Sequence, residues 1–270
     1  MSSNSNVNQK NLKENFDWEI PYESVPIPSE GLIYSPDSFL YKKNTIQIKS
    51  MTAKEEDILM SQAYIKDGLV IDKLLESCIT DKNIKPNEIL VGDKNAILIA
   101  IRITGYGDDY HVTHTCNNCD HKNNVTVVLS ELPIKRLEIK SVAEGQNLFE
   151  FVLPVSKKKI NFKYQTGKDQ REQEEIEKNL SKIGINKKTE NTLVTSLLEN
   201  FIVAIDGVTD KNKIKSFINS MPALDSKKLR EYYSKNEPGI SNNWKYTCLS
   251  CKFENEFNFP LTSEFFWPKP

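Results

Sequence analysis

Four of the five cysteines form two Cys-x-x-Cys pairs, and these thiols are the residues of the chain best suited to chemistry. Cys116 and Cys119 follow Tyr-His-Val-Thr-His-Thr, and Cys248 and Cys251 follow Trp-Lys-Tyr-Thr. Two such pairs supply the four thiolates of a tetrahedral zinc site, and four thiolates leave no open position for a substrate or for water. The sequence therefore predicts one structural Zn²⁺ ion bound by all four cysteines.

A shared ion requires the C-terminal region to fold back onto the middle of the chain, because the pairs lie far apart in sequence. Strand-like residues flank each pair, at 109–115 and 125–129 and again at 244–247 and 253–259. We therefore expect each pair to lie at the turn of a β-hairpin, as in a zinc ribbon. Leu-Ser-Glu-Leu after the first hairpin and Leu-Thr-Ser-Glu-Phe after the second indicate two copies of one hairpin.

Three other uses of these cysteines stay open on the sequence alone. Each pair could bind its own metal, with His111, His114 or His121 beside the first pair, but no histidine lies near the second. A redox dithiol is another use, although neither pair opens the strand-to-helix unit of a thioredoxin-like site. An iron–sulfur cluster also uses four cysteines. The fifth cysteine, Cys78, lies in an apolar helical pattern that is typical of a buried core residue.

Composition excludes several classes of protein. The 270 residues carry a net charge of −1, which gives no overall attraction to nucleic acid or to anionic membranes. No stretch approaches the roughly 18–20 apolar residues of a membrane span. The N-terminus lacks the apolar segment of a secretory signal. We therefore expect a reducing cytoplasm, where paired cysteines bind metal more often than they form disulfides.

The predicted fold class is α+β, with helical segments around a discontinuous zinc-ribbon-like pair of β-hairpins and one additional β-hairpin. Four regions are expected. They are a disordered tail at 1–17, an N-terminal helical region with the first cysteine hairpin at 18–130, an inserted hairpin and helical region at 131–240, and the second cysteine hairpin with an aromatic C-terminus at 241–270.

Several elements around the cysteines can be located. Alternating apolar residues predict a strand at 44–49, and Thr52 with Glu55 forms a capping box that begins a helical block. Asp93 is the predicted N-cap of an apolar helix over 96–103, which Gly105 should end. The additional hairpin is expected at 148–153 and 159–164. Apolar residues with a 3.6-residue repeat predict a helix over 192–205.

We expect no catalysis and no small-molecule substrate. All three histidines lie near the first cysteine pair, and no phosphate-binding glycine motif occurs. Two functions stay open. One is an assembly protein whose N-terminal prolines and C-terminal aromatic residues contact protein partners, and the other is a zinc-ribbon nucleic-acid-binding accessory protein. The aromatic C-terminus itself is expected either to dock in a groove of its own chain or to be exposed for a partner. The residues between the paired cysteines count against the second, because they carry no positive charge; they are Asn117, Asn118, Leu249 and Ser250.

A series of short segments resembles the baseplate hub assembly proteins of T-even-type contractile-tailed bacteriophages. The resemblance extends over about residues 25–267. It implies a protein needed to build the hub of the tail baseplate, with other baseplate hub or tail proteins as partners. Such a protein is present in the host cytoplasm during assembly and is either retained in the virion or acts only as an assembly factor. The segments are Pro28–Tyr34, Met51-Thr52, Leu90–Asp93, Ile101–Gly107, Ile205–Gly207, the two cysteine pairs and Phe265-Phe266.

Overall fold

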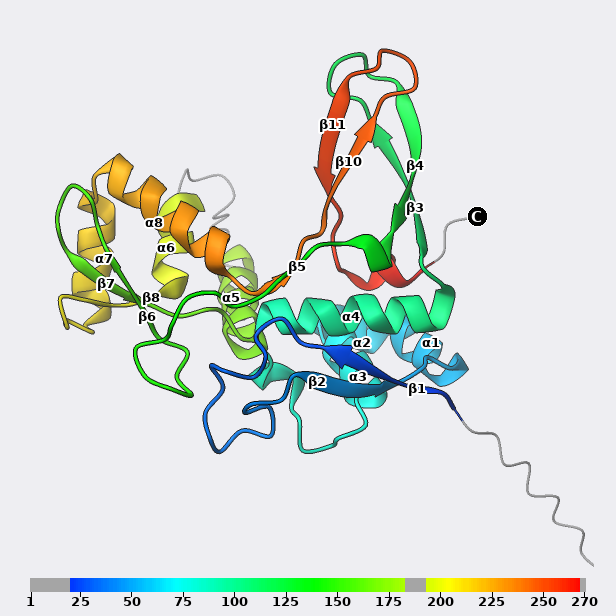
Figure 1. Ribbon diagram of the computed structural model, residues 1–270, viewed down its shortest axis with the longest axis horizontal. Coiled ribbons are helices and arrows are strands. Elements are labelled where there is room, and N and C mark those ends of the chain that lie inside the picture. The colour runs from blue at the N-terminus through cyan, green and yellow to red at the C-terminus, as the bar shows by residue number, and fades with distance from the viewer. Residues whose placement is uncertain (1–19, 183–192, 268–270) are drawn as a thin grey trace, which may run out of the picture.

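The computed structural model describes residues 20–182 and 193–267. Short antiparallel strand pairs and one three-stranded sheet combine with helices in a mixed fold (Figure 1). The prediction of helices together with small antiparallel hairpins is therefore confirmed. The tail predicted at residues 1–17 lies outside the described residues.

The N-terminal region begins with a two-stranded antiparallel sheet, which confirms the strand predicted at 44–49. Its strands are β1 (Tyr22–Pro26) and β2 (Thr45–Lys49). Three short helices follow, and they are α1 (Ala53–Met60), α2 (Gln62–Asp67) and α3 (Val70–Cys78). The predicted capping box is confirmed, because the backbone N–H and Oγ1 of Thr52 donate to the Glu55 carboxylate at 2.9 and 2.6 Å.

Helix α4 (Val91–Tyr106) lies between the N-terminal helices and the cysteine hairpins (Figure 1). The short 3₁₀ helix η1 (Pro86–Glu88) precedes it. The predicted boundaries of α4 are wrong at both ends, because the helix begins before Asp93 and passes through Gly105 to end at Gly107 (φ 85°). Although much of α4 is apolar and buried, no helix within 20–182 and 193–267 has the length and apolar character needed to cross a bilayer.

Asp93 makes tertiary contacts instead of capping α4. Its buried carboxylate accepts hydrogen bonds from the backbone N–H of Ser29 at 2.8 Å and from the Tyr34 hydroxyl at 2.7 Å. The Tyr34 oxygen in turn accepts from the backbone N–H of Leu90 at 2.9 Å. Asp93 therefore fixes the proline-containing segment after β1 against the start of α4. This long-range role cannot be read from a local helix pattern.

The inserted region contains a three-stranded antiparallel sheet in the order β6-β7-β8. The predicted additional hairpin is confirmed as β6 (Phe149–Val152) and β7 (Lys159–Phe162). The helix predicted over 192–205 is wrong at its C-terminal end, where β8 (Ile202–Ile205) pairs with β7. Backbone pairing with β7 overrides the apolar repeat there. The helices are α5 (Gly167–Lys182), α6 (Leu193–Phe201), α7 (Lys211–Ser220) and α8 (Ala223–Asn236).

Two matching hairpins project together from the side of α4 (Figure 1). The first consists of β3 (Asp109–Thr115) and β4 (Lys122–Val128), and the second of β10 (Asn243–Thr247) and β11 (Glu254–Asn258). A 3₁₀ turn follows each hairpin, η2 (Leu129–Glu131) and η3 (Ser263–Phe266). Where the chain leaves and re-enters the hairpin pair, β5 (Ile134–Lys135) pairs with β9 (Gly239–Ile240).

The buried apolar residues form one continuous cluster from Val25 to Phe266. Cys78 is fully buried in it, as predicted. Phe265 and Phe266 are also fully buried, and the Phe265 ring lies 5.1 Å from that of Tyr110 on β3. The C-terminal aromatic pair therefore packs on its own chain, so the expectation that these two side chains contact a partner is wrong.

Candidate metal centre

The structure brings the four paired cysteines together at the far end of the two hairpins. All four sulfur atoms lie within 4.8 Å of one another. The Cys116 and Cys251 sulfurs are 3.7 Å apart and those of Cys119 and Cys248 are 3.8 Å apart, so both contacts cross between hairpins. A tetrahedron with metal–sulfur bonds of about 2.3 Å has edges of about 3.8 Å, whereas a disulfide would require about 2.05 Å. The four thiols are thus spaced so that they could hold one tetrahedral metal ion.

Each cysteine pair lies in a turn held by the same backbone hydrogen bonds. In the first knuckle, defined as residues 116–121, the Cys116 N–H donates to the His121 carbonyl at 2.9 Å. In the second knuckle, residues 248–253, the Cys248 N–H donates to the Phe253 carbonyl at 2.9 Å. Both sulfurs of each pair belong to the same group of four sulfurs. The residue after each second cysteine adopts a left-handed conformation, at Asp120 (φ 55°) and Lys252 (φ 61°).

A buried asparagine of the first hairpin reaches across to the second knuckle. The Asn123 side chain is 2% exposed. Its Nδ2 donates to the Cys248 sulfur at 3.5 Å, and its Oδ1 accepts from the Leu249 backbone N–H at 3.0 Å. A second bond from Nδ2 to the His121 carbonyl, at 3.0 Å, fixes the orientation of the amide.

The second hairpin returns the same contacts to the first knuckle. The Asn255 Nδ2 donates to the Cys116 sulfur at 3.4 Å, and its Oδ1 accepts from the Asn117 backbone N–H at 2.9 Å. Sequence reasoning missed both asparagines. The signal that identifies them is their shared position, four residues after the second cysteine of each pair.

Hydrogen bonds shift the thiol pKa values in opposite directions. The Cys251 backbone N–H and the Asn123 amide donate to the Cys248 sulfur, and together they outweigh burial and lower its pKa to about 6. For Cys119, the His121 N–H lowers the pKa, but contacts with neighbouring sulfurs outweigh it and raise the pKa to about 12. Binding of a metal ion by the Cys119 thiolate would therefore have to displace the proton of that thiol.

The side chains of His111 and His114 contact hairpin residues and not the sulfur cluster. His114 Nδ1 lies 2.9 Å from the Tyr246 hydroxyl, and the His114 ring stacks on Phe257 with centroids 4.7 Å apart. His111 Nδ1 contacts the Thr126 hydroxyl at 3.0 Å. Among the residues that the structure describes, the cluster of potential metal ligands contains the four cysteines and no histidine. This geometry favours one shared site over two separate ones.

Arg102 connects the base of the hairpins to α4. Its side chain is only 2% exposed, and it donates to the carbonyl oxygens of Gly107 at 3.0 Å and Phe265 at 3.3 Å. A longer contact of 3.5 Å reaches the Asp109 carbonyl at the start of β3, and the guanidinium lies over the Tyr106 ring. One buried cation thus holds the first hairpin and the C-terminal turn on the same helix.

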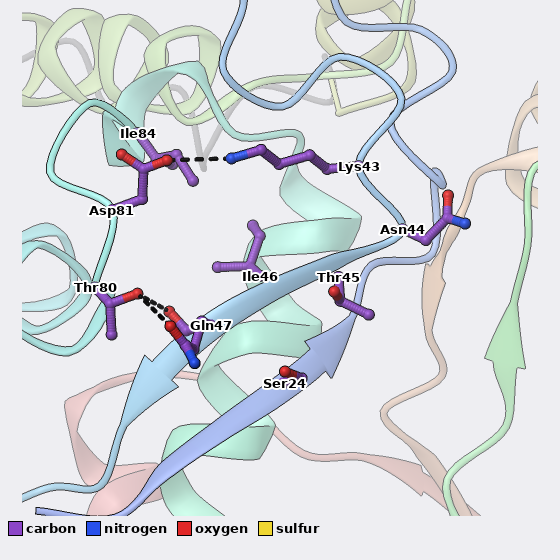
Figure 2. A pocket seen from close by; sticks show the side chains of 9 residues that line it. All are labelled: Ser24, Lys43, Asn44, Thr45, Ile46, Gln47, Thr80, Asp81 and Ile84. Carbon is purple, nitrogen blue, oxygen red and sulfur yellow. Dashed lines mark hydrogen bonds and ion pairs between the residues drawn. The ribbon is translucent and has the colours of Figure 1, made fainter.

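A cavity of about 380 Å³ lies away from the paired cysteines, between β2 and the loop at 80–84 (Figure 2). A Lys43–Asp81 ion pair of 3.1 Å spans one end, and the Thr80 hydroxyl donates to the Gln47 carbonyl at 3.0 Å at the other. Ile46 lies between these two contacts (Figure 2). These contacts pair Lys43 with Asp81 and Thr80 with Gln47, and sequence reasoning did not identify this cavity.

The family model described as T4 bacteriophage base plate protein matches residues 34–267. The chain belongs to this family. The match includes both cysteine pairs, α4 and the buried C-terminal turn, so it covers the candidate metal centre and the helix beside it. The resemblance inferred from the short sequence segments is confirmed at the level of a T4-type baseplate protein. No curated protein and no solved structure gave a significant match.

Membership of this family assigns a structural role in the phage tail. Proteins of the baseplate build the tail and are generally non-catalytic, and their partners are other baseplate proteins. The family likewise suggests a component of the virion tail. The four sulfurs that could hold a metal ion belong to this structural protein and lie at the end of the hairpins that projects from α4 (Figure 1).

Proposed function

We propose that this baseplate protein is a subunit or assembly factor of the baseplate hub, stabilised by one structural Zn²⁺ ion and acting through protein–protein contacts. The family match over residues 34–267 is the observation that carries the baseplate role. The hub assignment rests on the resemblance of the short segments to hub assembly proteins. The protein acts in the host cytoplasm during assembly, and it has neither a substrate nor a catalytic step.

The metal ligands in this proposal are Cys116, Cys119, Cys248 and Cys251. Support for a single ion comes from the sulfur separations, because four sulfurs within 4.8 Å enclose one ion but not a cluster of several irons and sulfides. Support for zinc comes from the four thiolates in tetrahedral placement. With all four positions filled by protein, the ion stabilises the fold and does not activate water.

We also propose that residues 131–240 form an insertion between the regions 18–130 and 241–270, which together build the zinc-ribbon-like hairpin pair. The pairing of β5 with β9 supports this division, because Ile134 lies opposite Ile240 where the chain enters and leaves the insertion. The ion would then link the two outer regions of the chain. The alternative function of a nucleic-acid-binding accessory protein gains no support from the family.

The hub assignment is tested by tagging the chain in phage-infected cells and isolating tail assembly intermediates. We expect the tagged protein to co-purify with baseplate hub proteins and to be required for hub formation. Recovery only with outer baseplate proteins, or normal hubs in its absence, would contradict the assignment. A Cys248→Ser variant, made in the same cells, tests whether the metal centre contributes to assembly.

A further inference from the structure

We propose that Asn123 and Asn255 are positioning residues of the metal centre, each stabilising the metal-bound thiolates of the opposite hairpin. This inference rests on the proposed zinc site, because it assigns the donors that support its ligands. Each carboxamide donates to the first cysteine of the other hairpin, Asn123 to Cys248 and Asn255 to Cys116. Each hairpin thus donates a hydrogen bond to a proposed metal ligand of the other hairpin.

The contacts fix the orientation of both amides. The Asn123 Nδ2 contacts a carbonyl oxygen and a sulfur, which are acceptors, while its Oδ1 faces the Leu249 backbone N–H. The Asn255 Nδ2 likewise contacts the Phe253 carbonyl at 3.1 Å and the Cys116 sulfur. Reversing either amide would place donor against donor, so the geometry leaves one orientation. Both side chains are at most 2% exposed, so water does not compete for these bonds.

The chemistry of the centre explains why an amide is required. A zinc ion with four thiolates carries a net negative charge, and hydrogen bonds to the sulfurs stabilise that charge. An asparagine supplies this donor and also accepts the N–H of the opposite knuckle without adding charge. An aspartate would keep the acceptor but lose the donor and repel the thiolates. An alanine would leave a buried backbone N–H without its partner.

The aspartate variants test the donor side of each amide. Asn123→Asp and Asn255→Asp keep an acceptor for the backbone N–H of the opposite knuckle, but they replace the donor to sulfur with a charge that repels the thiolates. If the donation to sulfur matters, both variants should weaken metal binding. The matched control is Asn124→Asp on the same strand, where the side chain is exposed and accepts from the Thr113 hydroxyl at 3.0 Å.

The experiment uses the full-length protein and measures zinc affinity by competition with a chromophoric chelator. We expect each of the two variants to bind zinc about 10–100-fold more weakly, with Asn124→Asp changed by less than about twofold. In the cobalt-substituted protein, the sulfur-to-cobalt charge-transfer band should move to lower energy in the two variants, because their thiolates hold electrons less tightly. Wild-type affinity and an unshifted band in both would overturn the proposal.

A measurement on the wild-type protein covers the case in which the variants do not fold. With an NMR-active cadmium isotope in the site, a side-chain amide proton of each asparagine should show scalar coupling to the metal through the N–H···S bond. Absence of this coupling in a cadmium-loaded protein contradicts the positioning role and leaves the metal site standing. Failure of the wild-type protein to bind zinc, cobalt or cadmium contradicts the metal centre itself.

Discussion

The side-chain amide of Asn255 lies 3.4 Å from the sulfur of Cys116, although 139 residues separate them in the chain. The contact of Asn123 with Cys248 is its counterpart, across 125 residues. Each hairpin therefore contacts a cysteine of the other, and each knuckle depends on the opposite hairpin for this contact. During synthesis the first knuckle has to wait for the C-terminal hairpin before its sulfurs gain these contacts.

Removing one thiol should loosen both hairpins. We expect Cys248→Ser to accelerate amide hydrogen exchange at residues 110–128, because loss of one ligand from a shared ion releases the other hairpin as well. Cys78→Ala is the control, since Cys78 is buried in the core outside the site. In Cys78→Ala, amide exchange at residues 110–128 should change no more than exchange in the rest of the protein. Unchanged exchange there in Cys248→Ser would show that the pairs do not share an ion.

Arg102 should contribute strongly to stability. Arg102→Met keeps the length of the side chain but removes charged donors from the buried carbonyl of Phe265 and from that of Gly107. We expect the free energy of unfolding to fall by about 2–4 kcal/mol, measured by urea denaturation. Arg136→Met is the control, because its ion pair with Glu30 is exposed and should be worth less than about 1 kcal/mol. Equal losses in the two variants would refute the anchoring role.

Glu55 should make stability depend on pH in the acid range. Burial raises the pKa of its carboxyl, but hydrogen bonds from Lys49, Ser77 and Thr52 outweigh burial and lower the pKa from 4.5 to about 2. Because the folded-state pKa is lowered, this stabilisation is present above about pH 4.5 and is lost as pH falls toward 2.

The difference in unfolding free energy between wild type and Glu55→Gln isolates this carboxyl, since both proteins keep the same thiols. We expect a difference on the order of 3 kcal/mol at pH 7, which shrinks as pH falls below 4.5. Chemical denaturation at several pH values provides the measurement. A difference that stays constant from pH 7 to pH 3 would rule out the proposed contacts of the Glu55 carboxylate.

Close backbone packing predicts the effect of Gly92→Ala. A Cβ atom at Gly92 would lie 1.8 Å from the carbonyl oxygen of Pro238, so α4 and the chain before β9 would have to separate. We expect a loss of about 1–3 kcal/mol, although alanine favours helix formation. A gain in stability, as alanine gives at an open helical site, would contradict this packing.

The local parts of the fold follow from the sequence, and the long-range parts do not. The knuckles and the capping box at Thr52 depend on residues a few positions apart, so their spacing reveals them. Asp93 matches a helix cap in sequence, but its partners Ser29 and Tyr34 lie about sixty residues away. Residues 202–205 continue an apolar repeat, but pairing with β7 makes them a strand.

The candidate site shows the same division. The four cysteines are recognisable as candidate ligands because each pair has the spacing of a knuckle. Asn123 and Asn255 act only across the hairpin pair, so their role depends on a contact that the sequence does not display. Phe265 and Phe266 could equally contact a partner or the core, and the carbonyl contact with Arg102 decides for the core.

The metal content of the purified full-length protein tests the central claim most directly. Elemental analysis should find about one zinc ion per chain. It should find almost none after Cys116→Ser or after Cys248→Ser, because each substitution removes a ligand of the same ion. Two ions per chain, no zinc in the wild type, or half of the metal retained after either substitution would contradict a single ion shared by the two hairpins.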